Sequence, residues 1–290
     1  MSRPGRKRGH TVCSYIAILL ILVITLFPVW WIIMISLKTS DQALAIPPKL
    51  IFKPTLENYR SVLFGAAQNA SGRWVPTTKG FLNQAVNSLV ICLSSTFLAL
   101  VAGVPAAYAL SKFNFKKKQD ISFFILSTRF MPPIVVVIPL FLLYRELGLM
   151  DTKLGLIILY TFISLSLVIW MMKGFFDEMP IELVESARVD GCSRFGALFR
   201  VAIPVTKQGI VASAILTLIG TWNEFLFAVI FTSKNAKTVT LSVMGYVTIR
   251  EVAWANMAAA GILITIPVLI FTILTQKHLV QGLTSGAVKG

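Results

Sequence analysis

Long apolar runs separated by short polar connectors dominate the sequence. Residues 11–37 form one such run and contain no charged residue. Because about 20 apolar residues of α-helix cross the roughly 30 Å hydrocarbon layer of a bilayer, a run of this length can form a membrane-spanning helix. Helices packed on a soluble core would instead show narrow apolar stripes. The pattern therefore predicts an all-α integral membrane protein.

Six transmembrane helices can be placed along the chain. The first is expected at residues 12–37. Five more are expected within residues 86–276, at about 86–110, 121–144, 154–172, 208–233 and 252–276. The third contains Arg129 and Pro132-Pro133, and the fifth contains Glu224. The remaining segments are a tail at 1–11, a polar loop at 38–85, a connector at 173–207 and a tail at 277–290.

A secretory signal peptide is the alternative interpretation of the first apolar run, because basic residues precede it. Ala43-Leu44-Ala45 would then be the cleavage site. Signal peptides, however, carry an apolar stretch of about 7–15 residues, and this run is far longer and ends well before that site. We therefore retain it as the first transmembrane helix, bent at Pro28.

Composition agrees with a membrane protein, since 56% of the 290 residues are hydrophobic and only 13% are charged. The net charge of +15 could indicate nucleic-acid binding. The basic residues are spread over short connectors, however, and do not form the single basic surface of a nucleic-acid-binding domain. They fit the rule that cytoplasmic connectors are basic. The densest groups, in the N-terminal tail and at Lys116 to Lys118, predict that both termini are cytoplasmic.

Candidate catalytic and metal-binding residues are few. Cys13, Cys92 and Cys192 are far apart, and His10 and His278 lie near opposite ends of the chain. Neither a disulfide framework nor a zinc site follows from such spacing. The sequence also lacks the Gly-x-x-x-x-Gly-Lys-Ser/Thr loop that binds nucleotide phosphates. We expect no bound cofactor or metal and no enzymatic activity of this chain.

The connector between the fourth and fifth spans has the most informative pattern. Pro180 suits the first position of a helix, and Glu182 and Glu185 favour the positive end of that helix. Gly191 can then end the helix in a left-handed conformation. The sequence thus predicts a short helix that begins near residue 180 and ends near residue 191.

A second short helix is expected directly after Gly191. Ser193 can serve as its N-cap, and Pro204 limits its continuation. Four apolar residues have the spacing of one helix face: Phe195, Leu198, Phe199 and Ala202. The pattern therefore predicts a helix-turn-helix on the cytoplasmic side, and an amphipathic linker on the membrane surface is the alternative.

Three short motifs in this connector are arranged as in a known family: Glu185-Ser186-Ala187, Asp190-Gly191 and Ile203-Pro204. They resemble the Glu-Ala-Ala…Gly…Ile-x-Leu-Pro loop of permeases in binding-protein-dependent ABC importers, with matching spacing. Ser186 replaces the usual first alanine, and Ala202 and Ile203 stand where the family prefers other aliphatic residues. These small or apolar changes leave docking feasible.

Further motifs resemble the carbohydrate branch of that family, and within it the second permease subunits of maltose-type importers. They are Asn87-Ser88, Pro132-Pro133, Ile138-Pro139-Leu140, Trp222-Asn223-Glu224-Phe225-Leu226 and the C-terminal residues 281–290. The resemblance thus extends over most of the chain.

The resemblance implies a type I ABC importer permease fold in the bacterial inner membrane. It implies a second, homologous permease subunit, two ATP-binding subunits that hold ATP and Mg, and a periplasmic solute-binding protein that delivers a sugar or sugar derivative. The chain would form half of an alternating-access pore. It would couple to the ATPase through residues 180–204.

Within that loop, the resemblance assigns ATPase contact to Glu182, Glu185, Ser186, Ala187, Asp190, Gly191, Ile203 and Pro204. Glu185 would be the charged contact, Ala187 would permit close approach, and Gly191 would allow the turn. The resemblance assigns a second ATPase contact to the C-terminal tail, through Gln281, Gly282, Thr284 and Gly286. A frayed tail is the alternative.

Candidates for the substrate pathway are Arg129, Trp222, Asn223 and Glu224. A charge inside a membrane span is costly, so it usually faces protein or water and often marks a functional site. A carboxylate and an amide can bind sugar hydroxyls, and an indole can pack on the apolar face of a pyranose. The alternative is a helix-packing ion pair between Arg129 and Glu224.

Other functions stay open from the sequence. The cargo could be a polyol, a sulfonated or otherwise acidic sugar, or a non-sugar solute. An ion-driven secondary transporter would need inverted repeats and more intramembrane acids, and a membrane enzyme would need a catalytic cluster. Neither pattern is apparent in the chain.

Overall fold

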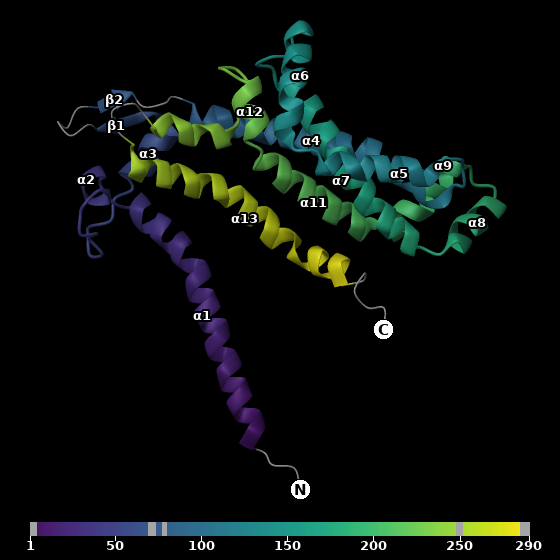
Figure 1. Ribbon diagram of the computed structural model, residues 1–290, viewed down its shortest axis with the longest axis horizontal. Helices are drawn as coiled ribbons and strands as arrows, with labels where there is room; N and C mark the ends of the chain where they lie inside the picture. The colour runs from purple at the N-terminus through teal and green to yellow at the C-terminus, as the bar shows by residue number, and fades with distance from the viewer. Residues whose placement is uncertain (1–4, 69–73, 77–79, 248–251, 285–290) are drawn as a thin grey trace. The chain divides into compact units, whose positions relative to one another are not determined.

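The computed structural model describes residues 5–68, 74–76, 80–247 and 252–284, and these residues are mostly helical (Figure 1). The chain divides into two compact units. Unit 1 comprises Met1–Phe81 and Ser242–Thr265. Unit 2 comprises Leu82–Leu241 and Ile266–Gly290.

Four of the described helices are long and apolar enough to cross a bilayer. They are α1 (Gly5–Ser36), α4 (Phe81–Lys112), α7 (Lys153–Glu178) and α13 (Trp254–Thr284). Two bent helix pairs raise the number of candidate spans to six if each pair is counted as one span. The prediction of an all-helical membrane protein is confirmed, with four to six candidate spans.

The third predicted span is one of these bent pairs. α5 (Lys118–Ser127) and the 3-10 turn η1 (Thr128–Phe130) lead to α6 (Pro133–Glu146), and the axis turns by 95°. Pro132 is extended at the N-cap of α6, and Pro133 is its first residue. Because proline lacks an N–H and disfavours helical geometry in the residue before it, this pair ends one helix and starts the next. The predicted interruption is therefore a sharp turn.

The fifth predicted span is divided into two helices. α11 (Lys207–Trp222) ends at Trp222, and α12 (Leu226–Phe231) follows after residues 223–225, which we call the fifth-span break. After α12 the chain continues to the 3-10 helix η3 (Val239–Tyr246). The prediction placed Glu224 inside a continuous helix, and that detail is wrong.

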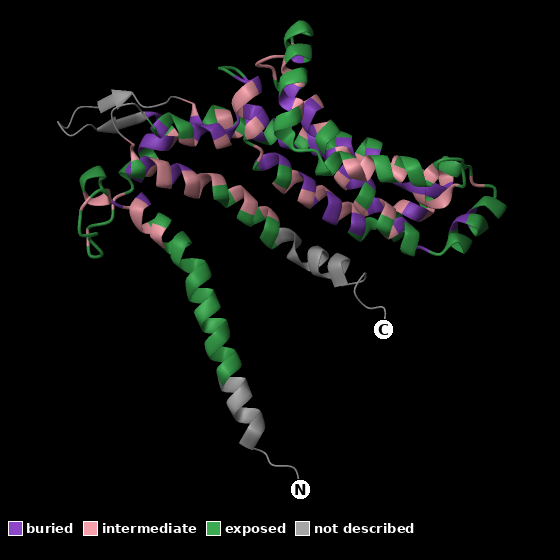
Figure 2. Ribbon diagram, in the orientation of Figure 1, coloured by how far each residue is buried: buried purple, intermediate pink, exposed green. Residues whose placement is uncertain are grey.

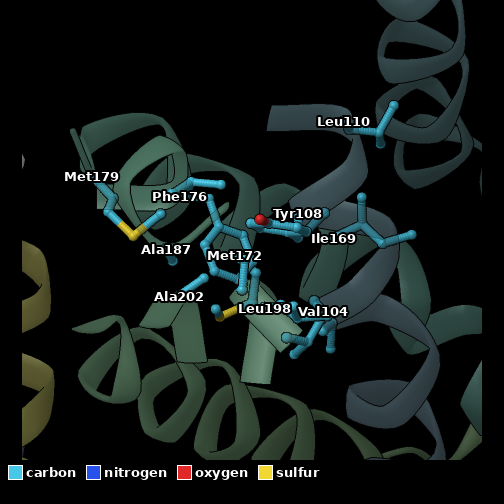
Figure 3. Packing of buried hydrophobic residues seen from close by; sticks show 14 of the residues in the cluster. Val104, Tyr108, Leu110, Ile169, Met172, Phe176, Met179, Ala187, Leu198 and Ala202 are labelled. Carbon is cyan, nitrogen blue, oxygen red and sulfur yellow. The ribbon is translucent and has the colours of Figure 1, made fainter. Parts of the chain in front are cut away.

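The core of unit 2 joins α4 and α7 to the segment that follows α7. Tyr108 of α4 lies against Phe176 of α7 with ring centroids 5.5 Å apart, and Met172 fills the space beside them (Figure 3). α7 and α11 also pack directly on each other. Gly209 allows this approach, because a Cβ atom there would lie 2.4 Å from the ring of Phe175.

Unit 1 contains α1, whose described side chains are mostly exposed (Figure 2). Apolar side chains exposed along a whole helix are unusual in a water-soluble monomer, and they suit a helix in lipid. Asn58 fixes the chain after α1, since its amide donates to the carbonyls of Ser36 and Lys38 at 2.8 and 2.7 Å.

Residues 38–85, expected as a polar loop, contain short elements of unit 1 and the start of α4. They are α2 (Ser40–Ala43), α3 (Glu57–Phe64) and the antiparallel hairpin of β1 (Ala66–Gln68) and β2 (Trp74–Pro76). This hairpin is the departure from an all-α fold within the described residues, together with an isolated bridge between Val247 and Val252.

Candidate functional site

The first half of the predicted helix-turn-helix is α8 (Ile181–Val189), which follows directly on α7. Gly191 ends it with φ +88°, the left-handed conformation that glycine adopts without steric cost. The N–H of Gly191 donates to the carbonyl of Arg188, and the N–H of Cys192 donates to that of Ala187. These two bonds form a Schellman motif. The predicted role of Gly191 in the turn is therefore confirmed, although Pro180 is the N-cap and not the first helical residue.

Two faces of α8 have different environments. Val184 and Ala187 are buried in the core of unit 2. The polar residues predicted here are exposed: Glu182, Glu185, Ser186 and Asp190. The small side chain of Ala187 thus makes its close approach to the chain's own core. The outward face of α8 presents exposed carboxylates, while its inward face is packed into the core of unit 2.

The second half of the loop is helical but irregular. Its segments are α9 (Arg194–Ala197), the π-helix η2 (Leu198–Ala202) and α10 (Ile203–Val205). The hydroxyl of Ser193 accepts from the N–H of Gly196 at 3.0 Å, so the predicted N-cap is confirmed. Pro204 is exposed and Ile203 is half-buried. The axis then turns by 79° into α11.

The predicted apolar face of this segment is divided between two environments. Leu198 and Ala202 are buried in the core, whereas Phe195 and Phe199 are 70% and 60% exposed. The single-face prediction is therefore wrong for the two phenylalanines. Ala197 occupies the buried position instead, and Phe195 lies about 200° away from it around the helix.

Polar contacts attach the loop to the ends of α4 and α7. The Lys112 ammonium donates to the carbonyl of Met179, just before α8. The Ser111 hydroxyl donates to Asp177 at 2.6 Å, and Lys173 forms an ion pair with the same carboxylate. In Figure 1, α8 and α9 lie together at the end of α7 where these contacts are made. The helix-turn-helix is thus fastened to the scaffold of unit 2.

Glu224 lies in the fifth-span break, where its carboxylate has three donors. Tyr160 of α7 donates its hydroxyl to Oε2 at 2.6 Å. The N–H groups of Phe227 and Ala228 donate to Oε1 and Oε2 at 2.9 and 3.1 Å. Because the first N–H groups of a helix lack intrahelical partners, the carboxylate caps α12. The side chain is half-buried, so part of it faces out of the chain.

The other pathway candidates have different environments. Trp222 is 2% exposed, so its ring is enclosed within the chain. Asn223 is exposed and donates to the carbonyl of Ile219. Arg129 is exposed at the turn before Pro132. Arg129 and Glu224, both within the described residues, form no ion pair with each other, so the alternative of a helix-packing pair is wrong.

One polar cluster in unit 2 was not anticipated from the sequence. Asp151, in the turn between α6 and α7, accepts hydrogen bonds from the backbone N–H groups of Ser233, Lys234, Asn235 and Ala236 at 2.9–3.1 Å. We call this arrangement the Asp151 clasp. Partial burial alone would raise the pKa of Asp151, but these hydrogen bonds outweigh it and hold the pKa well below its ordinary value. No local sequence signal links residues so far apart in the chain.

The predicted C-terminal contact residues fall at the edge of the described part. α13 extends through Gln281, Gly282 and Thr284, whose side chains are not described. Gly286 lies outside the described residues. The cysteines Cys13, Cys92 and Cys192 are free.

Comparison with known proteins identifies the family. The family model "Binding-protein-dependent transport system inner membrane component" matches residues 97–285, which include α8, η2 and the fifth-span break. The chain belongs to this family. It is a permease component of an ABC importer in the inner membrane, and it works with a periplasmic binding protein and with ATPase subunits that handle ATP.

Individual relatives cover nearly the whole chain. The trehalose transport system permease protein SugB of Mycobacterium tuberculosis is 35% identical over 290 residues, which cover 97% of this chain and 100% of SugB. The sulfoquinovosyl glycerol transport system permease protein SmoH of Agrobacterium fabrum is 34% identical over 279 residues, covering 95% and 93%.

A solved structure has the same fold. It is a chain of a bacterial ABC transporter involved in the import of the acidic polysaccharide alginate. The TM-score is 0.77 at 21% sequence identity, over 96% of this chain and 99% of that chain. With the family established, an ion-driven secondary transporter and a membrane enzyme are excluded as functions.

Proposed function

We propose that this chain imports a sugar or sugar derivative as one half of an alternating-access pore, paired with a related permease subunit. Residues 180–204 are its coupling element, docked on an ATPase subunit, and both termini lie on the same cytoplasmic side. ATP binding draws the ATPase subunits together, and the docked loops transmit that movement to the spans.

The build of the coupling loop supports this assignment. A docking element must present an exposed recognition surface and transmit force to the helices behind it. The exposed carboxylates of Glu182 and Glu185 meet the first requirement. The burial of Val184, Ala187 and Leu198 against α4 and α7 meets the second, because close-packed cores deform little. This combination is the observation that carries the proposal.

Sugar cargo is supported by the relatives and by the chemistry near the fifth-span break. SugB and SmoH are named for transport of trehalose and of sulfoquinovosyl glycerol, both carbohydrate derivatives. Asn223 and part of Glu224 offer an amide and a carboxylate at a helix interruption. Irregular backbone at membrane depth either is buried in protein or lines a water-filled cavity, and the exposure of Asn223 fits the second. Trp222 contributes by holding the end of α11 in place.

An acidic or sulfonated sugar is the second candidate cargo, and an exposed arginine favours it. Arg129 lies in the bend of the third span with its side chain exposed. A guanidinium binds sulfonate and carboxylate groups through paired N–H donors. SmoH shows that a relative of similar identity is named for a sulfonated glycoside.

The coupling assignment is tested by charge reversal on α8. Glu185→Lys should lower binding-protein-stimulated ATP hydrolysis of the reconstituted importer by about tenfold or more, the effect of one unfavourable charge at an interface. Glu146→Lys, an equal charge change in an exposed residue at the end of α6, is the matched control. Equal stimulation in both variants would sink the assignment of residues 180–204.

The cargo is tested by calorimetry on the periplasmic binding protein of the same importer. Trehalose, maltose, sulfoquinovosyl glycerol and sorbitol form the panel. Micromolar binding of trehalose or maltose supports a neutral sugar, and selective binding of the sulfonated compound supports the second candidate. Binding of sorbitol alone contradicts sugar cargo.

A further inference from the structure

The Asp151 clasp holds the segment between α12 and η3 at several points. Besides the four backbone donors, the hydroxyl of Ser233 and the amide of Asn235 donate to the Asp151 carboxylate. The backbone N–H of Asp151 donates in turn to the carbonyl of Phe231 at 2.8 Å. A carboxylate that accepts several hydrogen bonds is a strong attachment because each bond is charge-assisted.

The first turns of α4 hold the same segment from the other side. Asn87 donates through its amide to the carbonyls of Asn235 and Lys237, both at 3.0 Å. Ser88 accepts the N–H of Val239 at 2.8 Å. Asn87 and Ser88, which resemble a motif of the carbohydrate branch, both bind this segment. Residues 233–239 are thus fixed between α4 and the turn before α7.

The held segment is connected directly to the fifth-span break. Thr240 donates its hydroxyl to the backbone carbonyl of Glu224 at 3.1 Å. The side chain of Glu224 caps α12. The backbone carbonyl of the same residue accepts from Thr240, which follows the segment that the clasp holds. Asp151 and α4 thus bind residues 233–239, and Thr240, the next residue along the chain, bonds to the break.

We propose that Asp151 is a positioning residue of the transport cycle, which sets the geometry of the fifth-span break by fixing residues 233–240. The proposal rests on the proposed function. The break is where α11 ends and α12 begins, and short segments at helix ends absorb the backbone changes of hinge motions. A fixed segment on one side of the break makes α12 move together with the start of α7 and of α4.

Asp151 also has the geometry of a residue retained for a specific contact. Its φ is +55°, a left-handed conformation that is uncommon for residues other than glycine, and aspartate and asparagine adopt it more readily than most. Neither α6 nor α7 needs a carboxylate at this position, because Gly148 ends α6 and Thr152 caps α7. The side chain is therefore used for the distant segment.

The test compares hydrogen exchange and coupling in the complete importer in proteoliposomes, with its binding protein and the sugar that calorimetry selects. Asp151→Asn keeps the shape but removes the charge and places an amide against backbone N–H groups. It should raise amide exchange in residues 233–236 and lower binding-protein-stimulated ATP hydrolysis, each by about tenfold. Basal ATP hydrolysis should stay within about twofold, because the coupling loop is unchanged.

A second variant breaks the attachment from α4, so the test does not depend on the stability of one protein. Asn87→Asp cannot donate to the carbonyls of Asn235 and Lys237, and it should reproduce both effects. Thr240→Val removes the hydroxyl that reaches Glu224; it should lower stimulation while exchange in 233–236 stays unchanged. Glu146→Gln, on the last turn of α6, should change neither.

Two outcomes would overturn the proposal. In one, exchange rises but stimulated hydrolysis is unaffected, and the clasp is then a structural attachment only. In the other, exchange does not change, and the carboxylate then does not hold the segment. Failure of the proposed function would give a different result. The unmodified importer would then show no sugar transport, while the exchange comparison between variants would still report on the clasp.

Discussion

Two turns of unit 2 are built by the same local chemistry yet have different surroundings. After α6, Gly148 is left-handed at φ +66° and Thr152 caps α7 by accepting from Gly155; after α8, Gly191 and Ser193 repeat the pattern with Gly196. Both glycines end their helices in Schellman motifs. The turn after α6 carries Asp151 and is bound to a distant segment. The turn after α8 is exposed.

The difference separates local geometry from tertiary use. In each turn a left-handed glycine ends one helix and a nearby hydroxyl caps the next, so neighbouring residues alone form the turn. The carboxylates near the two turns differ in their surroundings. Asp151 accepts from backbone donors 82–85 residues away, whereas Glu182 and Glu185 on α8 are exposed. Between them lies α7, whose 26 residues span about 39 Å.

The largest expected effect separates the buried and exposed sides of the coupling loop. Leu198→Ala should destabilise the protein by about 2–5 kcal/mol, because the side chain is fully buried in the core. Phe199→Ala, at the adjacent exposed position, should leave stability nearly unchanged and lower stimulated ATP hydrolysis. Thermal unfolding of the purified importer measures the first quantity. Equal destabilisation by both variants would contradict the described orientation of η2.

A smaller effect is expected for the packing of α11 against the C-terminal part of α7. Gly209→Ala places a methyl group against Phe175 and should cost about 1–3 kcal/mol of stability, as overpacking does. Gly220→Ala is the matched control on the same helix, since a Cβ there meets nothing within 4 Å. It should be neutral or stabilising by up to about 1 kcal/mol. Melting temperatures in lipid nanodiscs compare the two, and a stabilising Gly209→Ala would rule out close packing of α7 on α11.

The smallest effect concerns pH at the Asp151 clasp. Its pKa is lowered in the folded chain, so the clasp contributes fully above the unfolded value of about 3.9 and loses strength as pH falls towards the folded pKa. Exchange in residues 233–236, taken as the ratio of Asp151→Asn to the unmodified chain, should be constant from about pH 7 to 5 and decline below about pH 4. A ratio that declines already near pH 6 would show that another group controls the segment.

Sequence reasoning succeeded where neighbouring residues decide the structure. Apolar runs longer than a bilayer requires predicted the helices, Pro132-Pro133 predicted an interruption, and Gly191 with Ser193 predicted a helix end and the next helix start. Each of these follows from the geometry of a few consecutive residues, as the structure confirms.

It failed where tertiary contacts decide. Residues 195 and 199 had the spacing of a buried face, but the core selected Ala197, Leu198 and Ala202, whose side chains fit against α7. Glu224 seemed a charge within a helix, whereas Tyr160 and the start of α12 stabilise it at a break. The Asp151 clasp joins residues that no local pattern relates.

Cross-linking can show whether the coupling loop docks on an ATPase subunit. Glu185→Cys and Glu146→Cys, each in a chain with Cys13, Cys92 and Cys192 replaced by serine, place single thiols on α8 and at the end of α6. The reagent is a short bifunctional thiol cross-linker, and the ATPase subunit carries native or introduced surface cysteines. Glu185→Cys should give a covalent product whose yield changes with ATP, and Glu146→Cys should give none. A product from Glu146→Cys but not from Glu185→Cys would contradict docking of the coupling loop.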